Sequence, residues 1–342
     1  MDSDIKCFLQ AQGLDNVRIT PLQYGGNNRT FEVQHKQHVY FLKQYFHHPK
    51  DQRDRLHHEF SFSNFLWNQC GLRNIPEPLS CDAQRHMGLY SFVQGRHLLP
   101  EEIDEGHILL CLDFFMMANR KKGHATARGL PRGSEASLSA RDHFASLEWR
   151  INRFEALGLM DSLDQEAAQF VCGEIASMWK DMKPNMVKQL KRLGIDMNQS
   201  LALDECCLSP SDFGFHNVIL GIDGKLYFTD FEYAGWDDIA KMVNDFFCQP
   251  EIPAPIKYFS RFSETVAGML PRPEFHLERI RILRPLHILK WCCLLLNEFL
   301  PVAQNRRRFA GACQDIREKK AQQLEKARRM FGRLHTEEAI AI

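Results

Sequence analysis

Three residues with oxygen-bearing side chains follow one another at short intervals late in the chain. Asn217 comes five residues after Asp212, and Asp230 comes thirteen residues after Asn217. An amide oxygen and a carboxylate on neighbouring strands can bind Mg²⁺, which prefers hard oxygen ligands. A second carboxylate can accept the proton of an attacking hydroxyl. This pattern predicts phosphoryl transfer from a nucleoside triphosphate to a hydroxyl; the alternative is that all three are ordinary turn and cap residues.

The residues between Asn217 and Asp230 predict a β-hairpin. Residues 218–220 are apolar and precede Gly221-Ile222-Asp223-Gly224, in which Asp-Gly supplies the positive φ angles of a tight turn. Residues 226–228 are Leu-Tyr-Phe, a composition typical of a strand. A hairpin here would bring the ends of the two strands, and therefore Asn217 and Asp230, together.

A lysine in the first quarter of the chain needs a partner. Lys43 lies in residues 39–45, which read as an aromatic and aliphatic strand, where an unpaired ammonium is costly. Glu59 follows sixteen residues later, in a helix predicted over 54–69. A strand lysine held by a helix glutamate can bind the α- and β-phosphates of a nucleotide. The alternative is a surface lysine on an edge strand.

A pair of glycines precedes that strand. Gly25 and Gly26 stand between two predicted strands and are followed by Asn27 and Asn28. Glycines allow the backbone to close over an anion, because a side chain would block the approach. A plain hairpin turn is the alternative.

These segments together resemble the aminoglycoside phosphotransferase and choline kinase superfamily, relatives of the protein kinases. The catalytic and metal loops of that superfamily resemble residues 209–233, and Asp230-Phe231-Glu232-Tyr233-Ala234-Gly235 is similar to the choline/ethanolamine kinase branch. The segment 25–29 resembles its glycine-containing nucleotide loop. One departure is Pro210, which stands where the superfamily usually has a histidine that supports the loop.

The resemblance implies an α+β, bilobal protein-kinase-like fold. Residues 1–93 would form an N-lobe with a small antiparallel sheet and one helix, and residues 94–342 a mainly helical C-lobe with the acceptor site. The adenine would meet the backbone of the segment that joins the lobes, at Ser91, Phe92 and Val93.

The resemblance also implies ATP and magnesium as cofactors. Asp212 would be the catalytic base, Asn217 and Asp230 would hold magnesium, and Glu232 would assist a second metal. The nucleotide would be bound by residues of the small lobe, namely Gly25, Gly26, Asn27, Asn28, Lys43 and Glu59.

Composition limits the possible partners and compartment. The chain has 342 residues, a hydrophobic fraction of 44%, a charged fraction of 25% and no net charge. These values are typical of a globular protein and suggest no polyanionic partner, so we expect neither nucleic-acid nor membrane binding. Residues 1–4 are acidic and lack a signal-peptide pattern, which predicts a cytoplasmic protein. The most apolar stretch, 286–300, is interrupted by polar residues and is too short to span a bilayer.

Cysteines and histidines are numerous but form no metal-binding pattern. The eleven cysteines include no C-x₂-C pair, so we expect reduced, mostly buried thiols. Pairs such as His47-His48 and His57-His58 lack the further ligands of a zinc site.

Two charged segments bear on the acceptor. Residues 120–133 are basic and rich in glycine, and predict a mobile loop that is either solvated or a lid over an anionic substrate. Residues 230–251 hold six acids against Lys241 and predict a need for cations. The metal would supply part of that charge and a positively charged acceptor the rest, unless Asp238 braces the catalytic loop. Trp291 would pack in the core or stack on a ligand.

The sequence leaves the acceptor open. A small molecule with a hydroxyl is expected: an aminoglycoside, choline or ethanolamine, a sugar, or another metabolite, with a metabolite favoured over an antibiotic. A nucleotide-binding pseudokinase and a protein nucleotidyl transferase are the alternatives, and the oligomeric state is not predicted.

Overall fold

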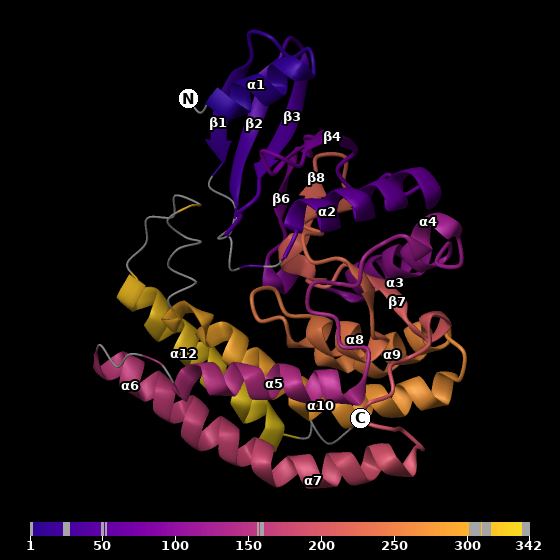
Figure 1. Ribbon diagram of the computed structural model, residues 1–342, viewed down its shortest axis with the longest axis vertical. Helices are drawn as coiled ribbons and strands as arrows, with labels where there is room; N and C mark the ends of the chain where they lie inside the picture. The colour runs from indigo at the N-terminus through magenta and orange to yellow at the C-terminus, as the bar shows by residue number, and fades with distance from the viewer. Residues whose placement is uncertain are drawn as a thin grey trace.

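The computed structural model describes residues 3–22, 28–48, 51, 53–155, 157, 161–300, 309 and 316–336. Its small upper lobe is built on a five-stranded antiparallel sheet with the strand order β1-β2-β3-β5-β4 (Figure 1). These strands are β1 (Arg18–Leu22), β2 (Arg29–His35), β3 (His38–Gln44), β4 (Pro78–Asp82) and β5 (Met87–Ser91).

Helix α1 (Ser3–Ala11) covers the sheet because its apolar residues repeat at helical spacing. Ile5, Phe8 and Leu9 are buried on one face of the helix and join Val33 and Leu42 of the sheet in a small core. This core is separate from the one that fills the rest of the molecule. The helix predicted over 54–69 is also present, as α2 (Arg55–Asn64) continued by a π-helical segment (Phe65–Gln69).

The larger lobe is mainly helical (Figure 1). Its helices are α3 (Glu105–Asn119), α4 (Ala125–Arg128), α5 (Ala140–Glu155), α6 (Ser162–Gln169), α7 (Ala176–Arg192), α8 (Ile239–Cys248), α9 (Phe259–Ala267), α10 (Pro273–Leu295) and α12 (Ile316–Gly332). Its strands are β6 (Gly95–His97), β7 (Cys207–Ser209), β8 (Val218–Gly221), β9 (Leu226–Phe228) and β10 (Gly235–Asp237). The α+β, bilobal kinase-like architecture predicted from the resemblance is confirmed.

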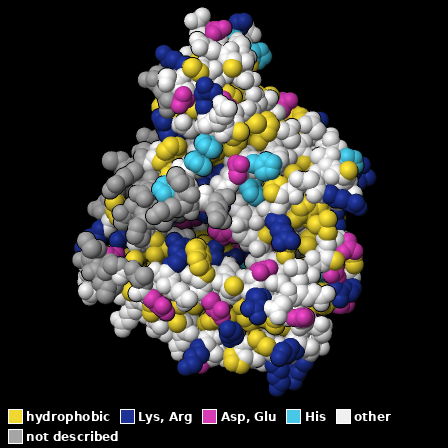
Figure 2. All heavy atoms as spheres, viewed as in Figure 1, with side chains coloured by type: hydrophobic (Ala, Val, Ile, Leu, Met, Phe, Trp, Pro, Cys, Tyr) yellow, Lys and Arg dark blue, Asp and Glu magenta, His cyan; other side chains and the backbone are white. Residues whose placement is uncertain are grey.

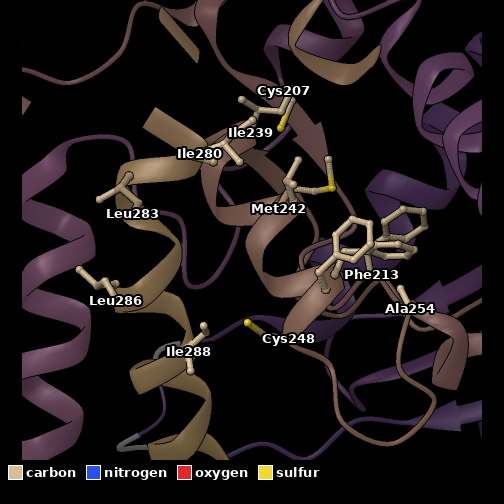
Figure 3. Packing of buried hydrophobic residues seen from close by; sticks show 14 of the residues in the cluster. Cys207, Phe213, Ile239, Met242, Cys248, Ala254, Ile280, Leu283, Leu286 and Ile288 are labelled. Atoms are coloured by element: carbon tan, nitrogen blue, oxygen red, sulfur yellow. The ribbon is translucent and has the colours of Figure 1, made fainter. Parts of the chain in front are cut away.

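The catalytic segment rests on the core of this lobe. Strands β8 and β9 form the predicted hairpin, with Val218 opposite Phe228 and Leu220 opposite Leu226. Figure 3 shows Phe213, the residue after Asp212, in the core with Met242 of α8 and with residues of α10. Helix α8 is buried along its whole length, so it provides a rigid base for the segment.

Helix ends follow local capping chemistry. Helix α5 begins with a capping box: the Asp142 amide donates to the Ser139 hydroxyl (3.1 Å), and the Ser139 amide donates to the Asp142 carboxylate (2.9 Å). Helix α3 begins at Glu105, because the Asp104 carboxylate accepts the His107 amide (3.0 Å) and caps the helix there. The helix around Pro285 is continuous rather than split.

The middle of the chain contains one more strand, and its basic segment differs from the expected mobile loop. Strand β6 forms just after the expected end of the small sheet, where it pairs with β8, and a Cβ at Gly95 would lie 2.3 Å from the Leu220 carbonyl oxygen. The basic segment 120–133 is not an open loop. It contains α4, and the Lys122 ammonium donates to the carbonyls of Asp204 (2.7 Å) and Cys206 (2.9 Å). Those carbonyl contacts hold the segment to the C-lobe.

The face shown in Figure 2 mixes charged and hydrophobic side chains and is hollowed between the small lobe and the helical lobe. Among the helices that the structure describes, none is long and apolar enough to cross a membrane. The ten cysteines within the described residues are all free thiols.

Candidate active site

A lysine and two carboxylates from three separate elements meet between the lobes. The Lys43 ammonium, on β3, lies 2.7 Å from the Glu59 carboxylate on α2 and 2.6 Å from the Asp230 carboxylate just after β9. Lys43 and Glu59 are buried, whereas 39% of the Asp230 side chain is exposed. The predicted pair of Lys43 and Glu59 is therefore formed, and the hairpin delivers Asp230 to the same ammonium.

The protonation of Lys43 is fixed by these neighbours. Burial lowers the pKa of Lys43, but the negative charges of Asp230, Glu59 and Glu232 outweigh it and raise the pKa well above its usual value. Glu59 is oriented by a second donor, because the Tyr45 hydroxyl lies 2.9 Å from its carboxylate. The lysine is therefore a permanent, positioned cation.

Asn28, the residue of the segment 25–28 that the structure describes, is hydrogen-bonded to the segment after β9. The Asn28 amide group donates to the buried Glu232 carboxylate (2.5 Å), and its oxygen accepts from the Phe46 backbone amide (3.0 Å). Glu232 also lies 3.9 Å from both Lys43 and Arg55. Gly25, Gly26 and Asn27 lie outside the described residues.

Asp212 is presented by a strained loop. Ser211 before it has φ of 66°, in the left-handed region that non-glycine residues rarely adopt. The loop is closed by Asn217, whose amide group donates to the Asp212 carbonyl (3.0 Å). It is anchored in the core by Phe213, whose ring packs in a tilted arrangement against Phe246 (5.2 Å between ring centroids). These contacts support the loop where Pro210 replaces the usual histidine.

A histidine that sequence reasoning missed faces Asp212. His216 Nε2 lies 3.3 Å from the Asp212 carboxylate, whose side chain is 37% exposed. Loss of water raises the pKa of Asp212, but His216 and Asn217 lower it overall, so the carboxyl stays ionised. The only sequence signal for His216 was its position four residues after Asp212 and next to Asn217. That spacing places the His216 and Asp212 side chains in one turn.

The site has more negative than positive charge, as a divalent cation requires. Loss of water around Asp230 raises its pKa to about 7; Lys43 opposes this rise, and Glu232 and Glu59 add to it. Three carboxylates thus surround one ammonium. Asn217 is linked to Asp230 through Thr229, whose amide and hydroxyl both donate to the Asn217 carbonyl (3.0 Å). Oxygen ligands with excess negative charge fit Mg²⁺.

The segment expected to contact adenine follows β5. Ser91 is already engaged, since its amide donates to the Glu77 carbonyl (3.0 Å) and its hydroxyl accepts from the Glu77 amide (2.8 Å). Phe92 and Val93 are half-buried. The next residue, Gln94, accepts from the Ile222 amide (3.0 Å), which fixes this connection to the β8–β9 turn.

A cavity of about 1100 Å³ opens beside Asp212 and His216. Its wall comes from α5, α8 and α10 together with Phe46, His48, Asp51, Arg53 and residues 134–137. Trp291 of α10 lines it, half-buried, and donates its indole N–H to the Asp245 carboxylate (2.8 Å). Trp291 was expected either to pack in the core or to stack on a ligand. It packs against the protein and also faces the cavity, so neither expectation is excluded.

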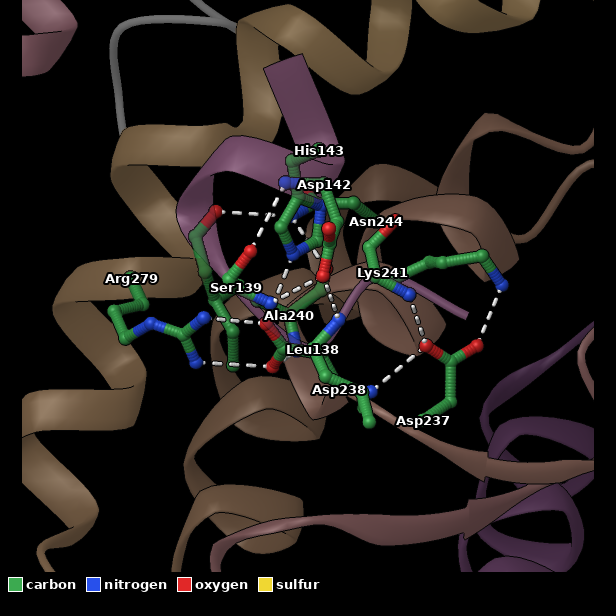
Figure 4. Close-up of polar contacts among 12 residues, drawn as sticks. Leu138, Ser139, Asp142, His143, Asp237, Asp238, Ala240, Lys241, Asn244 and Arg279 are labelled. Carbon is green, nitrogen blue, oxygen red and sulfur yellow. Dashed lines mark hydrogen bonds and ion pairs between the residues drawn. The ribbon is translucent and has the colours of Figure 1, made fainter. Parts of the chain in front are cut away.

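The acidic segment after Asp230 is neutralised from within the chain (Figure 4). Asp237 pairs with Lys241 (2.7 Å), and Asp238 pairs with both guanidinium nitrogens of Arg279 (2.5 and 3.0 Å). Asp238 also contacts His143 (2.9 Å), so it joins α5, α8 and α10 rather than bracing the catalytic loop. The prediction that this segment needs a cationic acceptor is therefore wrong for these residues.

Comparisons with known proteins bear on the fold. No protein-family model matches the chain, and no curated protein matches it by sequence. Solved structures do match. A choline/ethanolamine kinase family protein from Mesorhizobium loti is 13% identical with a TM-score of 0.59, and the match covers 100% of this chain and 98% of that one.

Two further structures agree. The ethanolamine kinase of Plasmodium vivax is 14% identical, with a TM-score of 0.58 and coverage of 93% of this chain and 85% of that one. A spectinomycin phosphotransferase, APH(9)-Ia, solved with ADP and spectinomycin, is also 14% identical, with a TM-score of 0.56 and coverage of 95% and 99%. The chain has the fold of these small-molecule kinases. At such identity the likeness concerns the fold, and the chemistry of this chain must be argued from its own residues.

Proposed function

We propose that the protein is an ATP-dependent phosphotransferase that moves the γ-phosphoryl group to a hydroxyl of a small molecule. The observation that carries the proposal is the position of the Lys43 ammonium, between Glu59 and Asp230, in a fold shared with small-molecule kinases. Buried ion triads are costly to form, so a functional role explains their presence better than stability does.

Each residue has a role in this proposal. Lys43, oriented by Glu59, would bind the nucleotide phosphates, and Gly25, Gly26, Asn27 and Asn28 would cover them. Asn217 and Asp230 would hold magnesium, which supplies charge neutralisation at the phosphates when bound. Glu232 would orient Asn28 and keep the site anionic, and a contribution to a second metal stays a prediction. The backbone at Ser91, Phe92 and Val93 would meet the adenine.

Asp212 would orient the acceptor hydroxyl and accept its proton. Its lowered pKa keeps it ionised, and it borders a cavity large enough for a small molecule. His216 would hold the carboxylate in place. Transfer of this kind depends mostly on positioning and charge neutralisation, which matches a site with one base and several charged ligands.

The test is a panel of metabolites and aminoglycosides with γ-labelled ATP. We expect label transfer to at least one hydroxyl compound and slow magnesium-dependent ATP hydrolysis without an acceptor. Asp212→Asn should lower transfer roughly 10²- to 10⁴-fold while ATP binding persists. Asp204→Asn, a charge loss at an exposed site, is the matched control and should leave transfer unchanged.

Other outcomes would separate the alternatives. ATP binding without metal and without turnover would favour a regulatory pseudokinase. Labelling of protein from α-labelled ATP would indicate nucleotidyl transfer. Full activity of Asp212→Asn on the true acceptor would refute the assignment of the base.

A further inference from the structure

We propose that the acceptor carries a second oxygen besides the hydroxyl that is phosphorylated, and that the Gln249 side-chain amide donates a hydrogen bond to it. The inference rests on the proposed function and concerns the cavity beside Asp212. It makes Gln249 a residue that selects polyhydroxylated acceptors, of the sugar or polyol class, over alcohols with a single oxygen, such as choline and ethanolamine.

The charged side chains of the cavity wall do not favour a ligand of either sign. Among the Asp, Glu, Lys and Arg residues that line it, acids and bases are equal in number. They also contact one another: Asp51 and Glu135 each contact arginines, and Asp245 contacts the Lys290 ammonium (2.5 Å). Recognition of the acceptor away from Asp212 therefore depends on the uncharged polar groups of the wall.

Gln249 provides such a group next to the catalytic loop. It follows α8 directly, its backbone amide donates to the Asp245 carbonyl (3.0 Å), and 4% of the residue is exposed. Its side chain lines the cavity together with Asp212 and His216. A Cβ at Gly214 would lie 3.2 Å from Gln249 Cγ and 2.9 Å from His216 Nδ1. The glutamine therefore packs directly against the loop that carries Asp212.

The orientation of the Gln249 amide is fixed by its partners. Its Oε1 atom accepts from the backbone amides of Glu251 (2.8 Å) and Ile252 (3.2 Å). Backbone amides only donate, so the side-chain oxygen must face them and the NH₂ group must point the other way. The two bonds hold the side chain in one conformation and satisfy its oxygen.

The NH₂ group of Gln249 has two N–H donors and no acceptor within the described residues. The group is not sealed inside the protein. Because the rest of the residue is buried and the side chain lines the cavity, the NH₂ group opens toward the cavity. Polar groups in buried surroundings are almost always hydrogen-bonded, and an unmade bond is costly. A ligand oxygen that accepts from this NH₂ group would remove that cost.

A serine hydroxyl in the same wall offers a second contact. Ser137 is 3% exposed, lines the cavity, and donates its backbone amide to Asp237 Oδ1 (3.0 Å). Its hydroxyl has no partner among the residues that the structure describes, and it is not sealed inside the protein. A hydroxyl can both donate and accept, so it suits another hydroxyl. A polyhydroxylated acceptor has oxygens for Gln249 and Ser137 in addition to the one at Asp212.

Alcohols with a single oxygen would leave the glutamine without an acceptor. In choline and ethanolamine that oxygen is the one that is phosphorylated, and the other polar group is a cation that cannot accept a hydrogen bond. Their binding would take water from the Gln249 NH₂ group without replacing it. A sugar or a polyol would replace that water with a second hydroxyl or a ring oxygen.

The test uses two pairs of candidate acceptors with magnesium and γ-labelled ATP: serinol against ethanolamine, and glycerol against 1-propanol. The members of a pair carry the same charge, and the second member has a single oxygen. We expect kcat/KM to be about tenfold or more higher for serinol and for glycerol, because a buried donor left unpaired costs at least that factor. Equal rates within the pairs, or a preference for ethanolamine or 1-propanol, would overturn the inference and leave the proposed function intact.

Gln249→Glu separates the NH₂ group from the rest of the side chain. A carboxylate keeps an oxygen for the amides of Glu251 and Ile252 but cannot donate. We expect the advantage of serinol over ethanolamine, and of glycerol over 1-propanol, to be lost. The added negative charge acts on both members of a pair, so it cancels in their ratio.

Gln199→Glu is the matched control, since it makes the same change at an exposed position. It should preserve the ratio within each pair. If Gln249→Glu preserves the ratio as well, Gln249 does not select the acceptor and the inference is overturned.

If neither pair is phosphorylated, the NH₂ resonances of Gln249 decide. They are assigned in ¹⁵N–¹H spectra by their loss in Gln249→Glu. We expect these protons to exchange with water about as fast as those of the exposed Gln199 side chain. They should also shift on addition of glycerol and not with 1-propanol at the same concentration. Protection from exchange, or the absence of a glycerol-specific shift, would overturn the inference. A lack of magnesium-dependent ATP hydrolysis, by contrast, would count against the proposed function alone.

Discussion

The Lys43 ammonium lies 2.6 Å from the Asp230 carboxylate, although 187 positions separate the two residues in the sequence. The same ammonium lies 2.7 Å from Glu59. A single cation thus connects the sheet of the small lobe, its helix α2 and the segment after β9. Both lobes must be in their observed relation for the three groups to meet.

Replacement of Lys43 tests whether this cation serves catalysis. Lys43→Met leaves Glu59, Asp230 and Glu232 close together without their shared partner, and it removes the proposed phosphate ligand. We expect turnover to fall on the order of 10²-fold, the size typical for loss of one preorganised charge-stabilising group. The measurement is steady-state transfer with γ-labelled ATP.

Lys225→Met is the control for this variant. The Lys225 side chain is 72% exposed, in the turn between β8 and β9, and should be dispensable. Equal losses in both variants would mean that the effect of Lys43→Met comes from general loss of charge rather than from its position.

Asn217 provides a test of the metal site. Asn217→Ala removes a proposed magnesium ligand and also the hydrogen bond that closes the loop at the Asp212 carbonyl. We expect the magnesium concentration for half-maximal activity to rise tenfold or more, since few ligands hold this ion. Removal of magnesium with EDTA should abolish transfer by the unaltered protein. Unchanged magnesium dependence in Asn217→Ala would exclude the residue from the metal site.

The parts of this site that the sequence predicts are those that depend on residues close together in the chain. The hairpin follows from an Asp-Gly turn between apolar runs, and it brings Asn217 and Asp230 together. The need of Lys43 for a partner follows from the cost of an unpaired ammonium in an apolar strand, and Glu59 lies on the helix that follows. In both cases the residues of one short segment are enough to predict the feature.

The parts that the sequence does not predict depend on partners far along the chain. The acids after Asp230 outnumber the basic residues of their own segment. Asp238, however, contacts His143, which is 95 positions away in the sequence, and Arg279, which is 41 positions away. Similarly, Lys122 is fixed by backbone carbonyls beyond position 200, which no charge pattern could reveal. Strand β6 has three exposed residues and no alternation of apolar side chains, so only its pairing with β8 defines it.

The pairing of Asp238 with Arg279 predicts a large effect on stability. Both side chains are buried, and Arg279→Met would leave the Asp238 carboxylate with His143 as its remaining charged contact. We expect the free energy of unfolding to fall by roughly 3 to 5 kcal/mol, the cost of leaving one member of a buried pair without its partner. Chemical denaturation monitored by circular dichroism measures it.

Arg281→Met on the same helix is the matched control. Arg281 pairs at the surface with Glu278, and its side chain is 38% exposed. Its replacement should change the free energy of unfolding by less than about 1 kcal/mol. If the two variants unfold alike, the buried pair contributes no more than a surface pair.

Two histidines behind the cavity wall lie in a chain of three polar contacts. His143 Nε2 lies 2.9 Å from Asp238, His143 Nδ1 lies 3.1 Å from His287 Nε2, and His287 Nδ1 lies 3.0 Å from Asp245. Each contact needs one proton, whereas two neutral imidazoles supply two. Both carboxylates are ionised, because their cationic neighbours outweigh burial and hold the pKa of Asp238 and of Asp245 well below the usual value.

One of the two imidazoles must therefore carry an extra proton. The groups around each ring determine which of the two it is. Burial, aided by the charge of Lys290 and opposed by that of Asp245, lowers the pKa of His287 to about 3, so His287 is the neutral ring, with its proton on Nδ1 facing Asp245. His143 then holds protons on both nitrogens. Long-range ¹⁵N–¹H NMR at neutral pH should show this pattern, with resonances assigned from His143→Gln and His287→Gln. A His143 ring with one bare nitrogen would contradict the proton count and would require a protonated carboxyl at Asp238 or at Asp245, of which Asp245 lines the cavity.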